Sequence, residues 1–125
     1  MTSTEAVHET FNEILMEIKR NTGIYALAIV LRDGLIVASL MPEDLDEETL
    51  AAMTATIIKA AETVFTELDK GDVKRIIIEG THAKIVAVTA GKDFVIVGMA
   101  NPETSLGIIL HSMRKAAEKI SQRTI

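Results

Sequence analysis

The chain contains no cysteine, and only 3% of its 125 residues are aromatic. The lack of cysteine excludes disulfides, thiolate metal sites and a cysteine nucleophile, and it favours a reducing, cytoplasmic setting. With few aromatic residues and a hydrophobic fraction of 48%, we expect an aliphatic interior. The net charge of -5 disfavours a nucleic-acid partner, because binding to phosphates requires a basic surface.

Long apolar runs are also absent. No run approaches the ~20 residues that a membrane-spanning helix requires, so we predict no insertion into a membrane. Residues 1–5 lack the basic and apolar regions of a signal peptide, which again favours the cytoplasm. A length of 125 residues suffices for a continuous core, and we predict a single domain over residues 1–125.

The sequence contains none of the short motifs that mark common catalytic or nucleotide-binding sites. There is no G-x-x-x-x-G-K-[ST] loop to hold phosphates, no G-x-G-x-x-G, and no G-x-S-x-G elbow for a serine nucleophile. His8 and Glu9 begin an H-E-x-x-H zinc pattern, but Asn12 replaces the second histidine, and both ligands are needed. His82 and His111 lie far apart in the sequence. We therefore predict no enzyme activity, no cofactor and no metal site.

The apolar blocks predict three helices and five strands. We expect helices at 4–20, at 46–69 and from 101 onward, and strands at 24–31, 35–40, 73–79, 84–90 and 94–100. Asp33-Gly34 predicts a tight hairpin turn, and Gly71 predicts the end of the long helix. Asn101 and Pro102 are residue types typical of an N-cap and a first helical position. The last three strands have such short links that they must form an antiparallel meander.

The first and last helices each carry one apolar stripe at helical spacing. In the first helix the stripe consists of Val7, Phe11, Ile14, Leu15 and Ile18. In the last helix it consists of Leu106, Ile109, Leu110, Met113, Ala117 and Ile120. Each stripe predicts one helix face packed against the sheet.

The long helix carries two apolar stripes, of which one sheet-facing helix needs only one. The stripe that we expect to face the sheet is Leu50, Met53, Ile57, Ala60, Ala61, Val64 and Leu68. The second stripe, Ala51, Ile58 and Phe65, recurs every seven residues, and we expect it to contact the same helix of a second copy. Alternatively, the first or last helix covers it within one chain. The acidic residues within 43–48 suit the positive end of the helix dipole, with a cation or partner site as the alternative.

The size of the predicted sheet also indicates a second copy. Each strand is nearly all apolar, so both faces of the sheet should be buried. Five strands at about 4.8 Å spacing make a sheet about 24 Å wide, while one helix covers about 10 Å. Three helices on two faces therefore leave one face half bare, and a second copy fills this gap most simply.

The order of these elements resembles the Roadblock/dynein light chain family over residues 5–122. The local pieces that carry the resemblance are Asp33–Ala38, the Ala/Glu helix that ends near Leu68, and Leu106–Leu110. The resemblance implies an α/β (α+β), three-layer, profilin-like fold. Its five-stranded antiparallel sheet has the order 2-1-5-4-3, with the long helix on one face and two helices on the other. It also implies a homodimer in which the third strands, with Ile76, Ile77 and Ile78, pair edge to edge and the long helices pack together.

Members of this family typically act as non-enzymatic scaffolds or regulators of small Ras-like GTPases, or as subunits of motor complexes, and they bind no cofactor. The first hypothesis is therefore a homodimer that binds a GTPase on its paired long helices. The candidate contact residues on the exposed side of that helix are Glu48, Ala55, Lys59, Glu62 and Thr66. The alternatives are a simple solvated face, a structural assembly subunit of a motor or trafficking-like complex, and a small-molecule-sensing domain.

Overall fold

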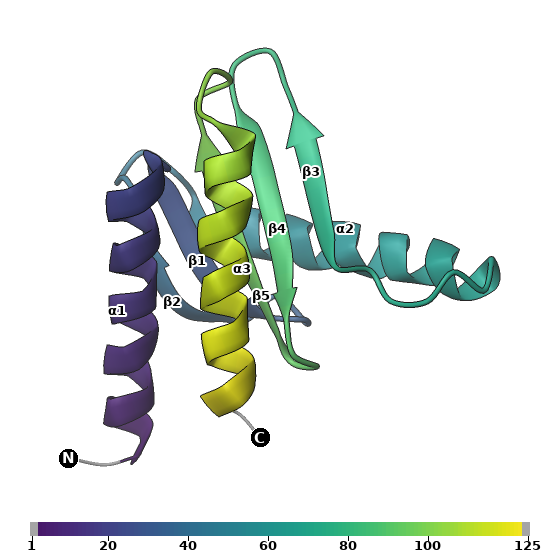
Figure 1. Cartoon of the computed structure of the whole chain (residues 1–125), viewed down its shortest axis with the longest axis horizontal. Coiled ribbons are helices and arrows are strands. Elements are labelled where there is room, and N and C mark those ends of the chain that lie inside the picture. Colours follow the sequence, from purple (N-terminus) through teal and green to yellow (C-terminus); the bar gives the residue numbers. More distant parts are fainter. Residues whose placement is uncertain (1–2, 124–125) are drawn as a thin grey trace.

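The computed structural model describes the backbone of residues 3–123 and the side chains of residues 10–122. The elements follow the order α1 (Ser3–Thr22), β1 (Ala26–Leu31), β2 (Ile36–Leu40), α2 (Glu47–Glu67), β3 (Arg75–Glu79), β4 (Lys84–Ala90), β5 (Phe94–Ala100) and α3 (Leu106–Arg123). Figure 1 shows three layers, with α1 and α3 on one face of the sheet and α2 behind the other. None of the described helices is long and apolar enough to cross a membrane.

The strands form one antiparallel sheet in the order β2-β1-β5-β4-β3, which confirms the expected topology. The β1–β2 hairpin turns at Gly34, whose φ of 96° lies in the left-handed region that favours glycine. The Gly34 amide donates to the Leu31 carbonyl at 2.8 Å. Further along the hairpin, Ile29 pairs with Ala38 but Val30 pairs with Ile36, so β2 contains a bulge. A bulge disrupts the ladder and increases the local twist of an edge strand.

Two apolar clusters hold the three layers together. The larger cluster lies between the sheet and the α1–α3 layer, where the Phe11 and Phe94 rings meet edge to face with centroids 5.3 Å apart. The smaller cluster lies between the sheet and α2, and it includes Val30, Ile58 and Val97. The interior is therefore almost entirely aliphatic, as the composition predicts.

The predicted stripes of α1 and α3 do face the sheet. Phe11, Ile14, Leu15 and Ile18 of α1 are buried, while Val7 and His8 lie outside the described side chains. In α3, the buried residues are Ile109, Met113, Ala117 and Ile120, with Leu106 and Leu110 partly buried against the same cluster. Both terminal helices thus cover the sheet face that the sequence assigns to them.

The prediction that the last helix begins at Asn101 is wrong. The Thr104 amide donates to the Asn101 carbonyl at 3.1 Å, so these residues form a turn. Helix α3 begins after Ser105, whose hydroxyl oxygen accepts from the Ile108 amide at 3.3 Å. An Asn-Pro pair starts a turn as readily as a helix, and Ser105 supplies the side-chain acceptor that an N-cap requires.

The prediction that Gly71 ends the long helix is also wrong. Asp69, with φ of 56°, takes the left-handed position after α2. Its amide donates to the Thr66 carbonyl at 3.2 Å, and the Lys70 amide donates to the Phe65 carbonyl at 2.8 Å. These two bonds form a Schellman motif, so the left-handed position is at Asp69, two residues before the glycine, and the helix itself ends at Glu67.

We predict that Asp69→Gly raises the free energy of unfolding by about 0.5 kcal/mol, because glycine adopts a positive φ without the strain of a Cβ. Urea unfolding at one fixed protein concentration measures the change. Gly71→Ala is the matched control. Gly71 has φ of 85°, and an added Cβ would meet no atom within 4 Å, so this variant should lose stability through backbone strain alone. A lower midpoint for Asp69→Gly would contradict this account of the helix end.

Candidate functional site

The apolar side of α2 that faces the sheet differs from the predicted one, although Leu50 is buried as predicted. The residues of α2 that are buried against the rest of the chain are Leu50, Ala51, Thr54, Ala55 and Ile58. The assignment of Ala51 and Ile58 to a contact with a second copy is therefore wrong, because each is only 1% exposed within one chain. Of the stripe expected to face the sheet, Met53, Val64 and Leu68 are 53%, 51% and 61% exposed.

The β1–β2 turn packs beside small residues of α2. A Cβ added at Gly34, in the β1–β2 turn, would lie 3.4 Å from the Ala52 Cα and 3.5 Å from the Ala55 Cβ. The turn therefore packs at van der Waals distance from these two alanines of the helix. Another side of α2 stays uncovered, and we call its apolar residues the exposed α2 stripe: Met53, Ile57, Ala60, Val64 and Leu68.

The C-terminal half of α2 extends beyond the sheet. In Figure 1, α2 crosses behind the strands and its C-terminal end projects past β3. Phe65 follows Ile58 by seven residues and so lies on the same, sheet-facing side of the helix. It is nevertheless 38% exposed, because the strands of this chain end before they reach it. The overhang thus presents an aromatic side chain that its own sheet does not cover.

β3 is an open and apolar edge of the sheet. Ile77 and Ile78 are 39% and 38% exposed, and Ile76 is partly buried. A small apolar groove runs between this edge and α2 and is lined by Thr54, Ile57, Ile58, Ile76, Ile78, Ile85 and Ala87. Ile76 and Ile78 therefore lie next to the exposed α2 stripe and form one apolar surface with it, whereas Ile77 faces the α1–α3 side of the sheet.

A second groove, of about 640 Å³, separates α2 from the β1–β2 turn, and we call it the α2–hairpin groove. Its lining residues are Arg32, Asp33, Ala52, Ala55, Thr56, Lys59 and Glu62. The Arg32 guanidinium donates through Nη1 to Glu62 Oε2 at 2.6 Å, and through Nη2 and Nε to the carbonyls of Gly91 and Lys92. Arg32 thus connects the hairpin, the β4–β5 turn and α2, a role that no sequence motif indicates.

The structure separates the five predicted GTPase contacts into two groups. Glu48, Lys59 and Thr66 are exposed and follow one another at intervals of eleven and seven residues, which places them along one line of the helix. Ala55 is only 8% exposed, so its assignment to the outer face is wrong. Glu62 reaches that face, but Arg32 holds its carboxylate in a half-exposed ion pair rather than leaving it free.

The N-terminus of α2 is capped by Asp46. Its carboxylate accepts from the Thr49 hydroxyl at 2.7 Å and from the Thr49 amide at 3.2 Å. These hydrogen bonds lower the pKa of Asp46 below its ordinary value, the hydroxyl contributing most. The next residue, Glu47, accepts from the Ser39 hydroxyl of β2 at 2.7 Å. The acidic segment therefore caps the helix and joins it to β2, which supports the interpretation of these residues as structural.

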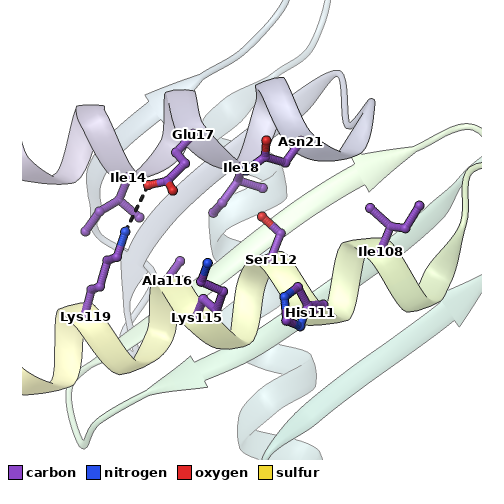
Figure 2. Close-up of a pocket in the computed structure, with 10 residues that line it drawn as sticks. All are labelled: Ile14, Glu17, Ile18, Asn21, Ile108, His111, Ser112, Lys115, Ala116 and Lys119. Atoms are coloured by element: carbon purple, nitrogen blue, oxygen red, sulfur yellow. Dashed lines mark hydrogen bonds and ion pairs between the residues drawn. The ribbon is translucent and has the colours of Figure 1, made fainter.

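A third groove, of about 240 Å³, lies between α1 and α3 on the opposite face of the sheet (Figure 2). Figure 2 shows the Lys119 ammonium of α3 donating to the Glu17 carboxylate of α1, at 3.0 Å. This hydrogen bond and the attraction of the ammonium lower the pKa of Glu17. His111 also lines this groove. The Glu17–Lys119 pair thus links the two terminal helices at the surface.

The amino-acid sequence is similar to that of a known domain family and of several other proteins. The sequence profile of the Roadblock/LC7 domain matches residues 10–100. An uncharacterized protein of Methanocaldococcus jannaschii, MJ1340, is 35% identical over 109 residues, which cover 87% of this chain and 95% of that protein. A second uncharacterized protein of that organism, MJ0310, is 34% identical over the same shares of both chains.

Solved structures share the fold at lower sequence identity. The gliding protein MglB of Thermus thermophilus has a TM-score of 0.86 at 20% identity, covering 98% of this chain and 91% of that chain. MglB of Myxococcus xanthus has a TM-score of 0.88 at 18% identity, with coverages of 93% and 88%. Profilin II of Acanthamoeba castellanii has a TM-score of 0.59 at 15% identity, with coverages of 88% and 98%. The profilin-like fold class is therefore confirmed.

We predict that Asp46→Ala lowers the melting temperature by roughly 3–6 °C, because α2 loses its capping acceptor. A group whose pKa is lowered in the folded state stabilises it above the ordinary pKa, and this contribution disappears as pH falls through the lowered value. The difference between wild type and Asp46→Ala should therefore be complete near neutral pH and shrink on acidification below pH 4. Asp46→Asn, which keeps an acceptor without a carboxyl group, is the control. A difference that stays constant down to pH 2 would exclude a role for the ionised carboxylate.

Proposed function

The chain belongs to the Roadblock/LC7 domain family, and from this premise we propose that it is a non-enzymatic, cytoplasmic homodimer that binds a small Ras-like GTPase. The homodimer rests on the contacts that one chain leaves open. The GTPase rests on the family and on the surface that stays exposed once those contacts are made. These two parts are supported separately and are tested separately.

The observation that carries the homodimer is the combination of an overhanging helix with an open strand edge. The exposed α2 stripe, Phe65 and the edge of β3 form a continuous apolar surface that a second copy can cover. If the two β3 edges join, each overhang reaches the sheet of the other copy, and the α2 helices lie side by side. Burial of a large aliphatic side chain stabilises by about 1.5–3 kcal/mol, so several such residues supply a strong driving force.

We predict that the wild-type chain is a dimer at micromolar concentration and that Ile57→Glu or Phe65→Glu makes it monomeric. A carboxylate at either position would be buried without a partner at the interface, at a cost of several kcal/mol, whereas in a monomer it stays hydrated. Sedimentation velocity measures the change. Met16→Glu is the control, because Met16 is 50% exposed on α1, on the other face of the sheet. A monomeric wild type would contradict the homodimer.

The proposed GTPase surface is the outer side of the paired α2 helices. Glu48, Lys59 and Thr66 point away from both the sheet and the exposed α2 stripe, so pairing of the helices leaves them accessible. The α2–hairpin groove lies beside them and adds a hollow with charged walls. A two-fold axis would place two such surfaces next to each other, which forms a large and regular docking face.

We predict that Lys59→Glu lowers GTPase capture at least about tenfold while the dimer and its melting temperature stay unchanged, because exposed charges contribute little to stability. The probes are the Ras-like GTPases encoded in the same genome, each loaded with GDP or with a non-hydrolysable GTP analogue. Glu62 is unsuitable for this test, since its reversal would break the ion pair with Arg32.

Lys19→Glu on α1 is the charge-matched control for Lys59→Glu, because Lys19 is also exposed but lies on the other side of the sheet. If Lys19→Glu abolishes capture and Lys59→Glu does not, the GTPase binds the α1–α3 face instead. If no GTPase is captured in either nucleotide state, an assembly subunit of a motor or trafficking-like complex becomes the better proposal. The grooves described above are open to solvent, and this shape does not favour a small-molecule sensor.

A further inference from the structure

We propose that β3 recognises a second copy of itself in a single register, centred on Ile77, in which Arg75 of each chain pairs with Glu79 of the other. This proposal rests on the homodimer proposed above and adds the device that selects the partner. It follows from the direction of the backbone groups, from the order of residues in β3, and from the position of the two charges.

The backbone of β3 offers a defined set of hydrogen-bonding groups at its free edge. The Thr89 amide of β4 donates to the Lys74 carbonyl at 3.0 Å, and the Gly80 amide donates to the Ala83 carbonyl at 2.8 Å. Lys74 and Gly80 therefore bond toward β4, and because directions alternate along a strand, Ile76 and Ile78 do so as well. The three remaining residues, at positions 75, 77 and 79, direct their N–H and C=O groups outward.

β3 has a charged residue at each end and three isoleucines between them. The strand reads Arg-Ile-Ile-Ile-Glu, with a cation at one end and an anion at the other. Antiparallel pairing of two copies about Ile77 brings all five residues opposite one another and places Arg75 opposite Glu79 of the second copy. A shift in either direction leaves residues at one end of the strand unpaired and places Arg75 opposite an uncharged residue.

The two charged side chains are available for this contact. Arg75 and Glu79 pair with Val88 and Lys84 across the β3–β4 ladder, so both lie on the α1–α3 face of the sheet. Both are exposed, and the ion pairs found among the described residues, Arg32–Glu62 and Lys119–Glu17, do not involve them. Lys84, the cation nearest to Glu79 in register, is 7% exposed and donates to the Thr104 carbonyl.

This arrangement makes β3 selective for itself. Opposite charges that face each other across two strands stabilise the pair, and like charges destabilise it. The two-fold axis repeats the Arg75–Glu79 contact. Reversing the charge of either residue therefore changes two contacts in the dimer. A strand with the same charge at both ends would meet one repulsive contact for each attractive contact. The isoleucines supply the affinity, and the charges at the two ends supply register and partner choice.

The test uses charge reversals at these two positions. Arg75→Glu places two acids opposite each other at both ends of the paired strands, and Glu79→Arg places two bases there. Each single variant alone should dissociate about tenfold more readily than wild type. An equimolar mixture of the two variants should form a one-to-one heterodimer of wild-type stability, because every facing pair is then again one acid and one base. The double variant Arg75→Glu with Glu79→Arg should recover the homodimer.

Dissociation constants from sedimentation equilibrium, with tagged subunits to count heterodimers, provide the readout, and the effect should shrink in 1 M salt. Lys74→Glu is the control, since it changes the net charge by the same amount as Arg75→Glu but lies opposite the uncharged Gly80 in the proposed register. If wild type is dimeric and both single variants dimerise as it does, the register is wrong while the homodimer stands. Loss of dimers in the single variants without recovery in the mixture also overturns the register. A monomeric wild type overturns both proposals.

Discussion

The packing of one side of α2 against the sheet and the β1–β2 turn is the constraint from which the rest of the surface follows. The sheet covers the side of α2 that carries Ala51 and Ile58, and Gly34 of the turn lies within van der Waals distance of Ala55 on the same side. A helix has a fixed angular spacing, and once one side is assigned the others follow. The bulky stripe that includes Met53 and Leu68 is thereby turned away from the sheet. The largely exposed apolar surface of α2 results from this orientation of the helix.

Arg32 strengthens the same constraint by electrostatic means. Its guanidinium bonds to Glu62 of α2 and to carbonyls of the β4–β5 turn, so it holds the helix at one position relative to two separate loops. The ion pair with Glu62 is partly exposed, and such a pair contributes about 0–1 kcal/mol. Its main consequence is geometric, since it holds α2 in the orientation in which its C-terminal half passes the edge of β3 and exposes Phe65.

The order and type of the elements could be predicted from the sequence because each has a strong apolar pattern of its own. Phe11 to Ile18 and Ile109 to Ile120 repeat at helical spacing, and the strands are short apolar runs between turn residues. The orientation of α2 could not be predicted in this way. Hydrophobicity alone assigns Met53 and Val64 to the sheet, whereas the true contacts are made with strands and with a turn that are distant in the sequence. The contacts of Arg32 and Glu62 are missed for the same reason.

Local rules also failed where two residues compete for one role. Asn101 and Ser105 are both suitable N-caps, and Asp69 and Gly71 both tolerate a positive φ, so composition does not select between them. The choice depends on where the helix can still pack. Ile109 and Met113 are fully buried in the larger cluster, and a helix that begins after Ser105 is long enough to place them there.

The two edges of the sheet differ in a way that explains how pairing would stop at two copies. β2 contains a bulge and is packed against α1, so it is a poor template for another strand. β3 is regular and mostly exposed, and Figure 1 shows its outer edge uncovered by the helices, so it is the edge that can accept a partner. When two copies use the same edge about a two-fold axis, that edge is consumed, and only the bulged β2 edges remain at the ends. A sheet built in this way closes as a dimer, whereas two equally regular edges would permit a fibre.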